Sequence, residues 1–326
     1  MRGRFVIHSP NWLGDVIMFL PAWRAWRDAH RGDEVHVVAK ARVAALWRLA
    51  ADIDGLVVLD DGIAGMRRAT AALRTLRPFS AISAPSSLRS ALLLRLGGAS
   101  SIRGTIGQCR TPLIGERVSL LGLEGAHQSL EYARIMGVEG SPLPPPSAAI
   151  DPARLPSPPA LPDGDFLAIL PGAARGGSKR WPPERFAAVA ARAIDAGLAA
   201  SAVVCGTQGE RAECDAVAAV LGNRATNLCG ATGLPALAAV LAKSRAVLSN
   251  DSGGMHLATA VGAPVVAVFG LTDPDKTGPL GRSAVVAAQG VPHSRAIPRE
   301  SAAAESALRS VSSESVFDAL ATLLGK

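Results

Sequence analysis

The 326 residues are 48% hydrophobic and 19% charged, a composition that excludes a disordered chain and a length that favours two globular domains. The net charge is +7, and nearly all of it lies in residues 1–150, which carry 18 Lys and Arg against 12 Asp and Glu, whereas residues 151–326 carry 16 against 15. This excess predicts an anionic partner for the first half, such as an acidic lipid head group, a membrane surface or nucleic acid, unless it is only the solvated surface of an arginine-rich protein.

The first half alternates between strand and helix patterns. Apolar runs predict strands at 4–9, 34–39, 56–59 and 80–84. The first helical pattern places Val16, Phe19, Leu20, Trp23 and Trp26 on one face. The N-terminus lacks the layout of a signal peptide, and no uncharged apolar run reaches the roughly 20 residues of a membrane span. We therefore expect a cytoplasmic protein.

A proline-rich segment separates the halves. Nine of the 23 prolines lie between residues 141 and 162, which predicts an extended, semi-rigid linker. Beyond it the patterns predict strands near 165–170, 200–205, 226–229, 245–249 and 264–269, and helices near 183–196, 209–221, 234–242, 254–261 and 314–324. The Ala- and Ser-rich stretch 283–312 carries no recognisable motif.

Repeated strand–helix units predict an α/β fold of two Rossmann-like domains, each with a doubly wound parallel sheet. We place the first domain at 1–150, the linker at 151–162 and the second domain at 163–326, with the last helix free to pack back on the first domain. Ligands of such sheets bind beyond the carboxyl ends of the strands, so two facing sheets would form a cleft. The four cysteines lack the paired spacing of a zinc site and are expected to be reduced, buried thiols: Cys109, Cys205, Cys214 and Cys229.

The turn after the first strand reads Ser-Pro-Asn-Trp-Leu-Gly-Asp at residues 9–15. It lacks the glycine fingerprint of a dinucleotide site. Asp15 instead opens the helix, where the helix dipole stabilises a carboxylate. Facing a cleft, this group could accept a proton from a substrate hydroxyl. The alternative is that Asp15 only caps its helix.

A second turn, at residues 171–182, holds three glycines followed by Ser178, Lys179 and Arg180. Backbone donors and a cation are what a diphosphate needs when it leaves with negative charge. The Walker spacing is absent, which argues against an ATPase. Pro182 or Pro183 fits the first turn of the next helix. The alternative is a mobile basic surface loop.

The most informative turn is Asn-Asp-Ser-Gly-Gly-Met-His at residues 250–256, between a strand and a helix pattern. Ser252 can cap the helix, and the glycines allow a ligand to approach backbone N–H groups, which predicts an anion site. His256 lies where the rest of the ligand would extend. A plain helix cap followed by a packed histidine is the alternative. In a third turn, at 205–210, Glu210 could bind a sugar hydroxyl or merely favour the helix start.

A basic segment follows the fourth strand, with Arg89, Arg95 and Arg103. These side chains could meet an anionic acceptor, or they could be solvated charges on an amphipathic helix.

Taken in order, four motifs carry a resemblance to a known family. They are Pro-Asn-Trp-Leu-Gly-Asp (10–15), Pro-Ser-Ser-Leu-Arg-Ser-Ala-Leu (85–92), Pro-Gly-Ala…Lys-Arg-Trp-Pro (171–182) and Asn-Asp-Ser-Gly-Gly-Met-His (250–256), and residues 264–280 continue the match. The chain resembles the lipopolysaccharide heptosyltransferases of glycosyltransferase family 9, with the heptosyltransferase II group as the most similar. Gly254 departs from the pattern, because the family more often has leucine there.

The resemblance implies a GT-B fold, with the nucleotide-sugar donor ADP-heptose bound by the second domain and the lipopolysaccharide inner core bound by the first. It implies inverting transfer without metal or another cofactor, with ADP as product. Asp15 matches the general base and Lys179 the lysine at the diphosphate. The other positions implied for the donor are Gly172, Ser178, Glu210, Thr232, Asp251, Ser252, Gly253 and His256. Those implied for the acceptor are Asn11, Gly14, Ser87 and Arg89.

The acceptor of the family carries carboxylates and phosphates, which suits the positive first half, and it lies at the membrane surface. The resemblance therefore implies a monomeric cytoplasmic enzyme, with peripheral attachment to the inner face of the cytoplasmic membrane left open, and no nucleic-acid partner. Three alternatives remain: another family 9 donor or acceptor, an NAD-dependent oxidoreductase using Asp60 and Asp61, and a nucleic-acid-binding protein. The missing glycine fingerprint at residues 9–15 argues against the oxidoreductase, and a nucleic-acid-binding protein leaves the turns at 171–182 and 250–256 unexplained.

Overall fold

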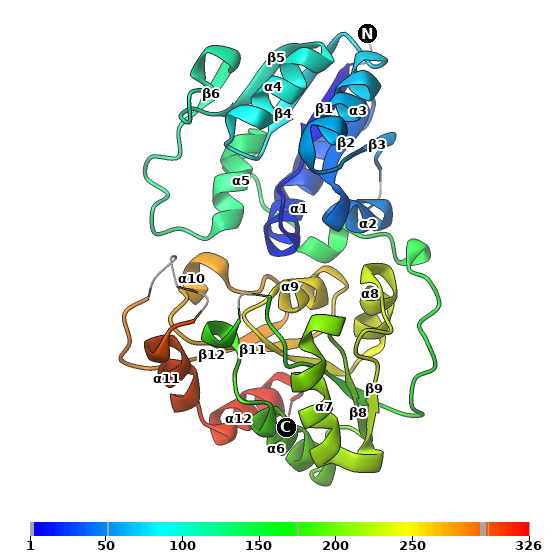
Figure 1. Cartoon of the computed structure of the whole chain (residues 1–326), viewed down its shortest axis with the longest axis vertical. Coiled ribbons are helices and arrows are strands. Elements are labelled where there is room, and N and C mark those ends of the chain that lie inside the picture. The colour runs from blue at the N-terminus through cyan, green and yellow to red at the C-terminus, as the bar shows by residue number, and fades with distance from the viewer. Residues whose placement is uncertain (1–2, 51, 175, 294–297, 299, 326) are drawn as a thin grey trace. The chain divides into compact units, whose positions relative to one another are not determined.

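The computed structural model describes residues 3–50, 52–174, 176–293, 298 and 300–325 (Figure 1). The chain divides into two compact units, unit 1 at residues 1–154 and unit 2 at residues 155–326. Each unit contains one parallel sheet of six strands with helices packed around it. The predicted α/β class is confirmed.

In unit 1 the sheet has the order β3-β2-β1-β4-β5-β6. Its strands are β1 (Arg4–His8), β2 (Glu34–Lys40), β3 (Gly55–Leu59), β4 (Phe79–Ser83), β5 (Ala99–Thr105) and β6 (Glu116–Val118). Its helices are α1 (Leu13–Ala29), α2 (Ala41–Leu49), α3 (Gly62–Arg74), α4 (Leu88–Gly97) and α5 (Gln128–Met136), with the short 3-10 helices η1 (Thr111–Leu113), η2 (Pro146–Ala149) and η3 (Pro152–Arg154).

Helix α1 is buried along most of its length because its aromatic side chains pack in the interior of unit 1. Trp23 and Trp47 are fully buried, and their rings meet edge to face at 5.4 Å. Phe19 contacts Tyr132 of α5 at 5.5 Å between ring centroids. These contacts fix α1, and with it the turn that precedes it, against the rest of unit 1.

In unit 2 the sheet has the order β12-β11-β10-β7-β8-β9. Its strands are β7 (Phe166–Leu170), β8 (Ser201–Val204), β9 (Ala225–Asn227), β10 (Ala246–Asn250), β11 (Val265–Phe269) and β12 (Ser283–Ala287). Its helices are α6 (Pro183–Asp195), α7 (Arg211–Leu221), α8 (Leu234–Lys243), α9 (Gly253–Ala260), α10 (Pro274–Thr277), α11 (Ala302–Ser310) and α12 (Ser313–Leu323), with η4 (Gly177–Lys179), η5 (Gln208–Glu210) and η6 (Gly222–Arg224).

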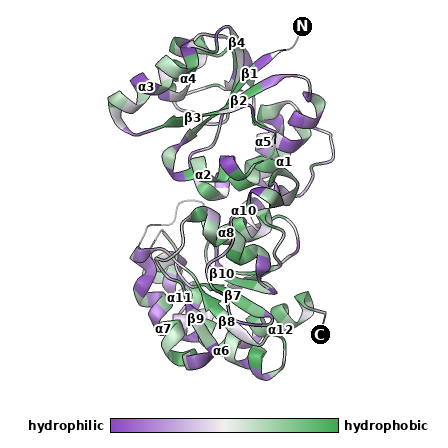
Figure 2. Cartoon of the chain, turned by 90° about the vertical axis from the view of Figure 1, so that its right-hand side faces the viewer, coloured by the Kyte–Doolittle hydropathy of each residue, from purple (hydrophilic) through white to green (hydrophobic). Residues whose placement is uncertain are grey.

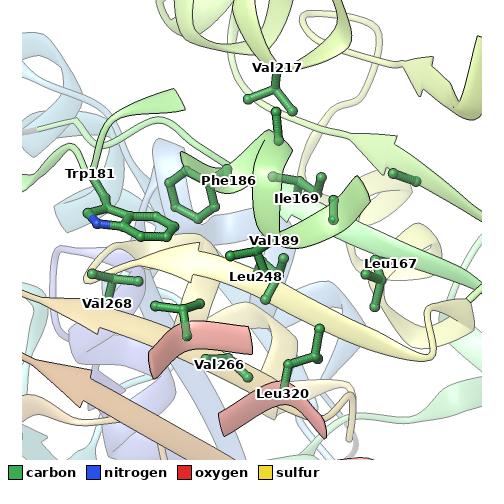
Figure 3. Packing of buried hydrophobic residues seen from close by; sticks show 14 of the residues in the cluster. Leu167, Ile169, Trp181, Phe186, Val189, Val217, Leu248, Val266, Val268 and Leu320 are labelled. Atoms are coloured by element: carbon green, nitrogen blue, oxygen red, sulfur yellow. The ribbon is translucent and has the colours of Figure 1, made fainter. Parts of the chain in front are cut away.

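The inner strands of unit 2 are hydrophobic on both faces, as expected of a parallel sheet covered by helices (Figure 2). Trp181 and Phe186 pack on one face with their rings edge to face at 4.9 Å (Figure 3). Helix α12 packs against α6, β11 and β12, and its Leu320 is fully buried in the same cluster. This core holds the amino-terminal end of α6 and the turn before it in place.

All nine predicted strands are confirmed, and Pro183 begins α6 with Pro182 at its N-cap, as expected. The patterns missed β5, β6 and β12, which are polar, short or half-buried. The basic segment is not one amphipathic helix: Arg89 and Arg95 lie on α4, whereas Arg103 lies on β5. Three cysteines are buried free thiols, but Cys109 is exposed, so the expectation of burial was wrong there.

None of the helices in the described part of the chain is both long and apolar enough to cross a bilayer.

Candidate active site

Both sheets have the doubly wound strand order, and both change direction once. The change falls between β1 and β4 in unit 1 and between β7 and β10 in unit 2. Loops at such a switch point diverge to opposite faces of the sheet and leave a crevice at its carboxyl edge. The turn at 9–12 and the turn at 84–87 meet at the first switch point, and the turns at 171–182 and 251–252 meet at the second.

A cavity of about 320 Å³ opens at the switch point of unit 1. Its lining includes Asn11, Trp12, Asp15, Ser87, Gln128 and Tyr132. Asp15 is half-buried in the first turn of α1, and its Oδ1 accepts a hydrogen bond from Gln128 Nε2 at 3.1 Å. Gln128 Nε2 also donates to the Tyr132 hydroxyl at 2.9 Å, so α5 orients the Asp15 carboxylate within the cavity.

Asp15 does not occupy the N-cap position of α1. Trp12 occupies the N-cap of α1 and makes no side-chain cap hydrogen bond, while Asp15 lies three residues further on. The Trp12 ring is 59% exposed, with the Arg42 guanidinium 4.4 Å from its centroid. A carboxylate and an exposed aromatic face therefore share one cavity.

The three arginines of the basic segment have different surroundings. Arg89 lines a second, smaller cavity together with Asn11 and Ser87, and its Nη2 donates to the Gly62 carbonyl at 2.7 Å. Arg95 instead donates to the Ala99 carbonyl at 2.8 Å, and Arg103 donates to the Ile135 carbonyl at 2.8 Å. Arg89 therefore lies at a cavity, whereas the hydrogen bonds of Arg95 and Arg103 join them to backbone carbonyls of unit 1.

In unit 2 the centre of the site is the ion pair between Lys179 and Asp251. Their side chains are 14% and 9% exposed, and Lys179 Nζ donates to Asp251 Oδ2. Thr272 Oγ1 donates to the same oxygen at 2.6 Å. Lys179 belongs to the short helix η4 and its side chain is largely buried, so it does not lie on an exposed surface loop. A buried pair with a hydrogen-bonded carboxylate places one cation at a fixed point of the switch crevice.

Beside Lys179, the Ser178 hydroxyl is buried, and among the described residues it has no hydrogen-bond partner. Buried polar groups are nearly always satisfied in folded proteins, so this hydroxyl points to a missing partner.

Asn250 ties the turns of unit 2 together. Its Oδ1 accepts from the Trp181 backbone N–H at 2.9 Å, and its Nδ2 donates to the Pro171 carbonyl at 2.7 Å. The residue is fully buried at the end of β10. One amide thus fixes both ends of the 171–182 turn to the strand that leads into Asp251.

Helix α9 begins at Gly253 with Ser252 at the N-cap, one residue before the expected start. The Ser252 hydroxyl makes no cap hydrogen bond, contrary to expectation, and lies 3.4 Å from the Ser249 hydroxyl. A β-carbon at Gly254 would lie 2.7 Å from Leu170 Cδ1, so a larger residue there would require the Leu170 side chain to move. His256 is buried within α9. The first backbone N–H groups of α9 therefore follow Asp251 and donate no hydrogen bond to the N-cap side chain.

Glu210 belongs to a capping box rather than standing free in the crevice. Its Oε2 accepts from the Thr207 N–H at 2.7 Å and from the Thr207 hydroxyl at 2.8 Å. A β-carbon at Gly172 would lie 2.3 Å from Glu210 Oε1, so the glycine makes room for this carboxylate. Thr232 is half-buried in the loop before α8. Within the described residues, no group of three or more His, Cys, Asp or Glu side chains is arranged to hold a metal ion.

A family model described as glycosyltransferase family 9 (heptosyltransferase) matches residues 66–305, well over half of the chain. The chain belongs to glycosyltransferase family 9.

Relatives within family 9 match nearly the whole length. The chain is 26% identical over 311 residues to lipopolysaccharide heptosyltransferase 2 of Escherichia coli K12, covering 87% of each protein. The structure of the E. coli ADP-heptose LPS heptosyltransferase II matches with a TM-score of 0.82 at 23% identity, covering 99% of this chain and 98% of that one. An E. coli heptosyltransferase solved with ADP matches with a TM-score of 0.75 at 20% identity, covering 98% and 99%. The likeness to the heptosyltransferase II group and the two-domain Rossmann-like fold are confirmed.

Sequence reasoning missed four residues of the candidate site. Gln128 and Thr272 orient the two key carboxylates, Asn250 fixes the 171–182 turn, and Trp12 supplies an exposed aromatic face. Trp12 lies in the motif at 10–15 and Asn250 in the motif at 250–256, so their closeness in sequence to Asp15 and Asp251 could have identified them as site residues. Gln128 is 113 residues from Asp15 and carries no local signal.

Proposed function

We propose that this family 9 protein transfers L-glycero-D-manno-heptose from ADP-heptose to the inner core of lipopolysaccharide, with inversion at the anomeric carbon and without a metal ion. In this proposal unit 2 binds the donor and unit 1 binds the acceptor at the inner face of the cytoplasmic membrane. The chain acts as a monomer and uses no other cofactor.

The observation that carries the proposal is the Lys179–Asp251 pair at the start of α9. Lys179 supplies positive charge, and the N–H groups of Ser252 and Gly253 supply donors, at a site where the helix dipole also favours an anion. A diphosphate bound there would be stabilised as its negative charge grows during departure. The buried Ser178 hydroxyl would find its partner in the same ligand.

Asp251 has a separate role in this scheme. Its Oδ2 is held by Lys179 and Thr272, so its position is fixed before any ligand arrives. We assign its other oxygen to a hydroxyl of the donor sugar. Gly172, Glu210, Thr232 and His256 complete the proposed donor site, with Glu210 acting mainly through the shape of its turn.

Asp15 acts as the general base. The acceptor hydroxyl loses its proton to Asp15 while its oxygen attacks the anomeric carbon, and the bond from that carbon to the diphosphate breaks with its electron pair leaving on ADP. Gln128 positions the carboxylate, and Asn11, Gly14, Ser87 and Arg89 hold the acceptor.

The base role is tested by Asp15→Asn, which keeps the shape of the side chain. General-base catalysis contributes about 100- to 10,000-fold, so kcat should fall by that factor while ADP affinity stays constant. Asp28→Asn is the matched control, because Asp28 lies on the exposed last turn of the same helix. Glu131 lines the same cavity and is the rival base. Retained activity in Asp15→Asn, with loss in Glu131→Gln, would assign the role to Glu131.

The donor role is tested by calorimetry with ADP, UDP and GDP. We expect selective ADP binding, weakened about 10- to 150-fold in Lys179→Ala because one charge-assisted hydrogen bond is lost. Lys243→Ala, at the exposed end of α8, is the control. Preference for UDP or GDP would refute ADP-heptose as donor, and loss of transfer in EDTA would refute metal independence.

A further inference from the structure

A second cavity, of about 160 Å³, lies beside the Asp15 cavity in unit 1. It is bounded by the carboxyl ends of β1, β2 and β3 and by side chains of α3 and α4. Asn11, Pro85 and Ser87 line both cavities and form their common wall. The Pro85 carbonyl in this wall accepts hydrogen bonds from Ser83, Ser90 and the buried Arg110, so the wall is firmly held.

His8 is one of the residues that line this second cavity. The side chain is 2% exposed, and among the described residues neither ring nitrogen makes a hydrogen bond of normal geometry. Burial, together with the positive charges of Lys40 and Arg110, lowers the pKa of His8 to about 4, although the Ser90 carbonyl acts in the opposite direction. His8 is therefore a neutral, buried side chain in the lining of this cavity, and its unsatisfied ring nitrogens make it a candidate partner for a polar ligand.

The remaining polar wall is cationic. Lys40 and Arg89 both line the cavity. Lys40 pairs with Asp61 at 2.5 Å, but the Lys40 side chain is 13% exposed whereas that of Asp61 is 83% exposed. An ion pair with one partner so fully in water contributes little, so a bound anion can replace Asp61.

We propose that this His8 cavity is an acceptor subsite that binds a phosphate or carboxylate group of the same molecule whose hydroxyl faces Asp15. The inference rests on the proposed function, because it takes the anion to be carried by the glycan acceptor. Lys40 and Arg89 neutralise its charge, and His8 and Ser87 donate hydrogen bonds to its oxygens. The volume equals about five water molecules at about 30 Å³ each, which suits one such group rather than a whole oligosaccharide.

The first test compares Lys40→Gln with wild type on two acceptors, one with its anionic groups intact and one with phosphates removed and carboxylates esterified. With the intact acceptor we expect an acceptor KM raised about tenfold, a nearly constant kcat and an unchanged donor KM. With the neutralised acceptor the two proteins should be equal. Arg68→Gln, on the exposed face of α3, is the matched control. Equal losses on both acceptors would overturn the proposal, because they indicate a structural role for Lys40.

The second test needs no transferase activity. Inorganic phosphate is titrated into the full-length protein while the His8 ring is followed by NMR, with His8→Gln identifying its signal among the six histidines. We expect a saturable shift of the His8 signal that disappears in Lys40→Gln. No shift, or the same shift in Lys40→Gln, would overturn the anion subsite even if heptose transfer is observed.

The two tests also separate the possible sources of the anion. A phosphate response at His8 without any acceptor-dependent effect of Lys40→Gln would overturn the acceptor assignment and indicate a free anion instead. If no transfer occurs with any donor, the proposed function fails, and the phosphate titration alone decides whether the subsite exists.

Discussion

Replacing Asn250 by alanine should loosen the 171–182 turn of unit 2 without removing a side chain that is proposed to contact a ligand. The substitution removes the acceptor of the Trp181 N–H and the donor to the Pro171 carbonyl. Because Asn250 is fully buried, water cannot easily take over these bonds. The turn that carries Lys179 would keep its sequence but lose the attachment of both its ends to β10.

The size of the effect follows from the two backbone groups left without partners. Each unsatisfied buried group costs about 1–3 kcal/mol, so Asn250→Ala should destabilise unit 2 by about 2–6 kcal/mol. Asn227→Ala is the matched control. Asn227 also accepts from a backbone N–H, that of Cys229 at 3.0 Å, and donates to a side chain, but it is exposed, so the same change should cost less than about 1 kcal/mol.

Amide hydrogen exchange measures the local effect directly. In wild type the Trp181 N–H should exchange slowly, and in Asn250→Ala it should exchange at least about 30-fold faster, which corresponds to 2 kcal/mol of lost protection. ADP affinity should fall in parallel, because Lys179 is no longer held in place. Unchanged protection of Trp181 together with unchanged ADP affinity would refute the view that Asn250 positions the turn.

Three further predictions concern single sites. The pKa of His8 is lowered to about 4 in the native state, whereas the unfolded chain binds this proton below about pH 6.5. Between pH 7 and pH 4 the wild type should therefore lose about 3 kcal/mol of unfolding free energy that His8→Gln retains. The same pH dependence of the unfolding free energy in both proteins, measured by urea denaturation, would refute this. In a thiol-reagent assay only Cys109 should react quickly in the native protein, because the other thiols are buried and burial raises the pKa of Cys205 to about 12; Cys109→Ser should abolish the fast phase. Gly254→Ala should destabilise unit 2 by about 1 kcal/mol, because the added methyl group contacts Leu170, and Leu170→Val should relieve most of that loss. If the changes in unfolding free energy are additive in a double-mutant cycle, the two side chains are not in direct contact.

Nine of the twelve strands in the described part of the chain could be predicted because a buried parallel strand tends to be a continuous apolar run. Strand β7 and strand β10 are buried at every residue and were clear in the sequence. Strand β6 has three residues, two of them exposed, and strand β12 is at most half-buried. Edge strands such as these form through backbone hydrogen bonds to the neighbouring strand, and these bonds leave no apolar pattern in the sequence.

Interactions of the candidate site could be predicted from the sequence when both partners lie in the same turn. Thr207 and Glu210 have the spacing of a capping box, and that local signal alone favours the helix start over the sugar contact considered for Glu210. The pairing of Lys179 with Asp251 joins turns after two adjacent strands, so it could be expected only in outline from the strand order. Gln128 reaches Asp15 because α5 packs on α1, which no short-range pattern reveals.

The ion pairs of unit 1 show which of its basic side chains are available to bind an anion. Many of its arginines are tied to carboxylates in unit 1, namely Arg4 to Glu34, Arg24 to Asp28, Arg27 to Asp54, Arg68 to Asp60 and Arg134 to Glu139. Such pairs add little long-range field. Lys40 and Arg89 differ, because they line one cavity and the carboxylate that pairs with Lys40, that of Asp61, lies in solvent. The proposed subsite attributes the attraction for an anion to two cations beside His8 rather than to the net charge, so removing Arg68 should leave acceptor binding intact whereas removing Lys40 should not.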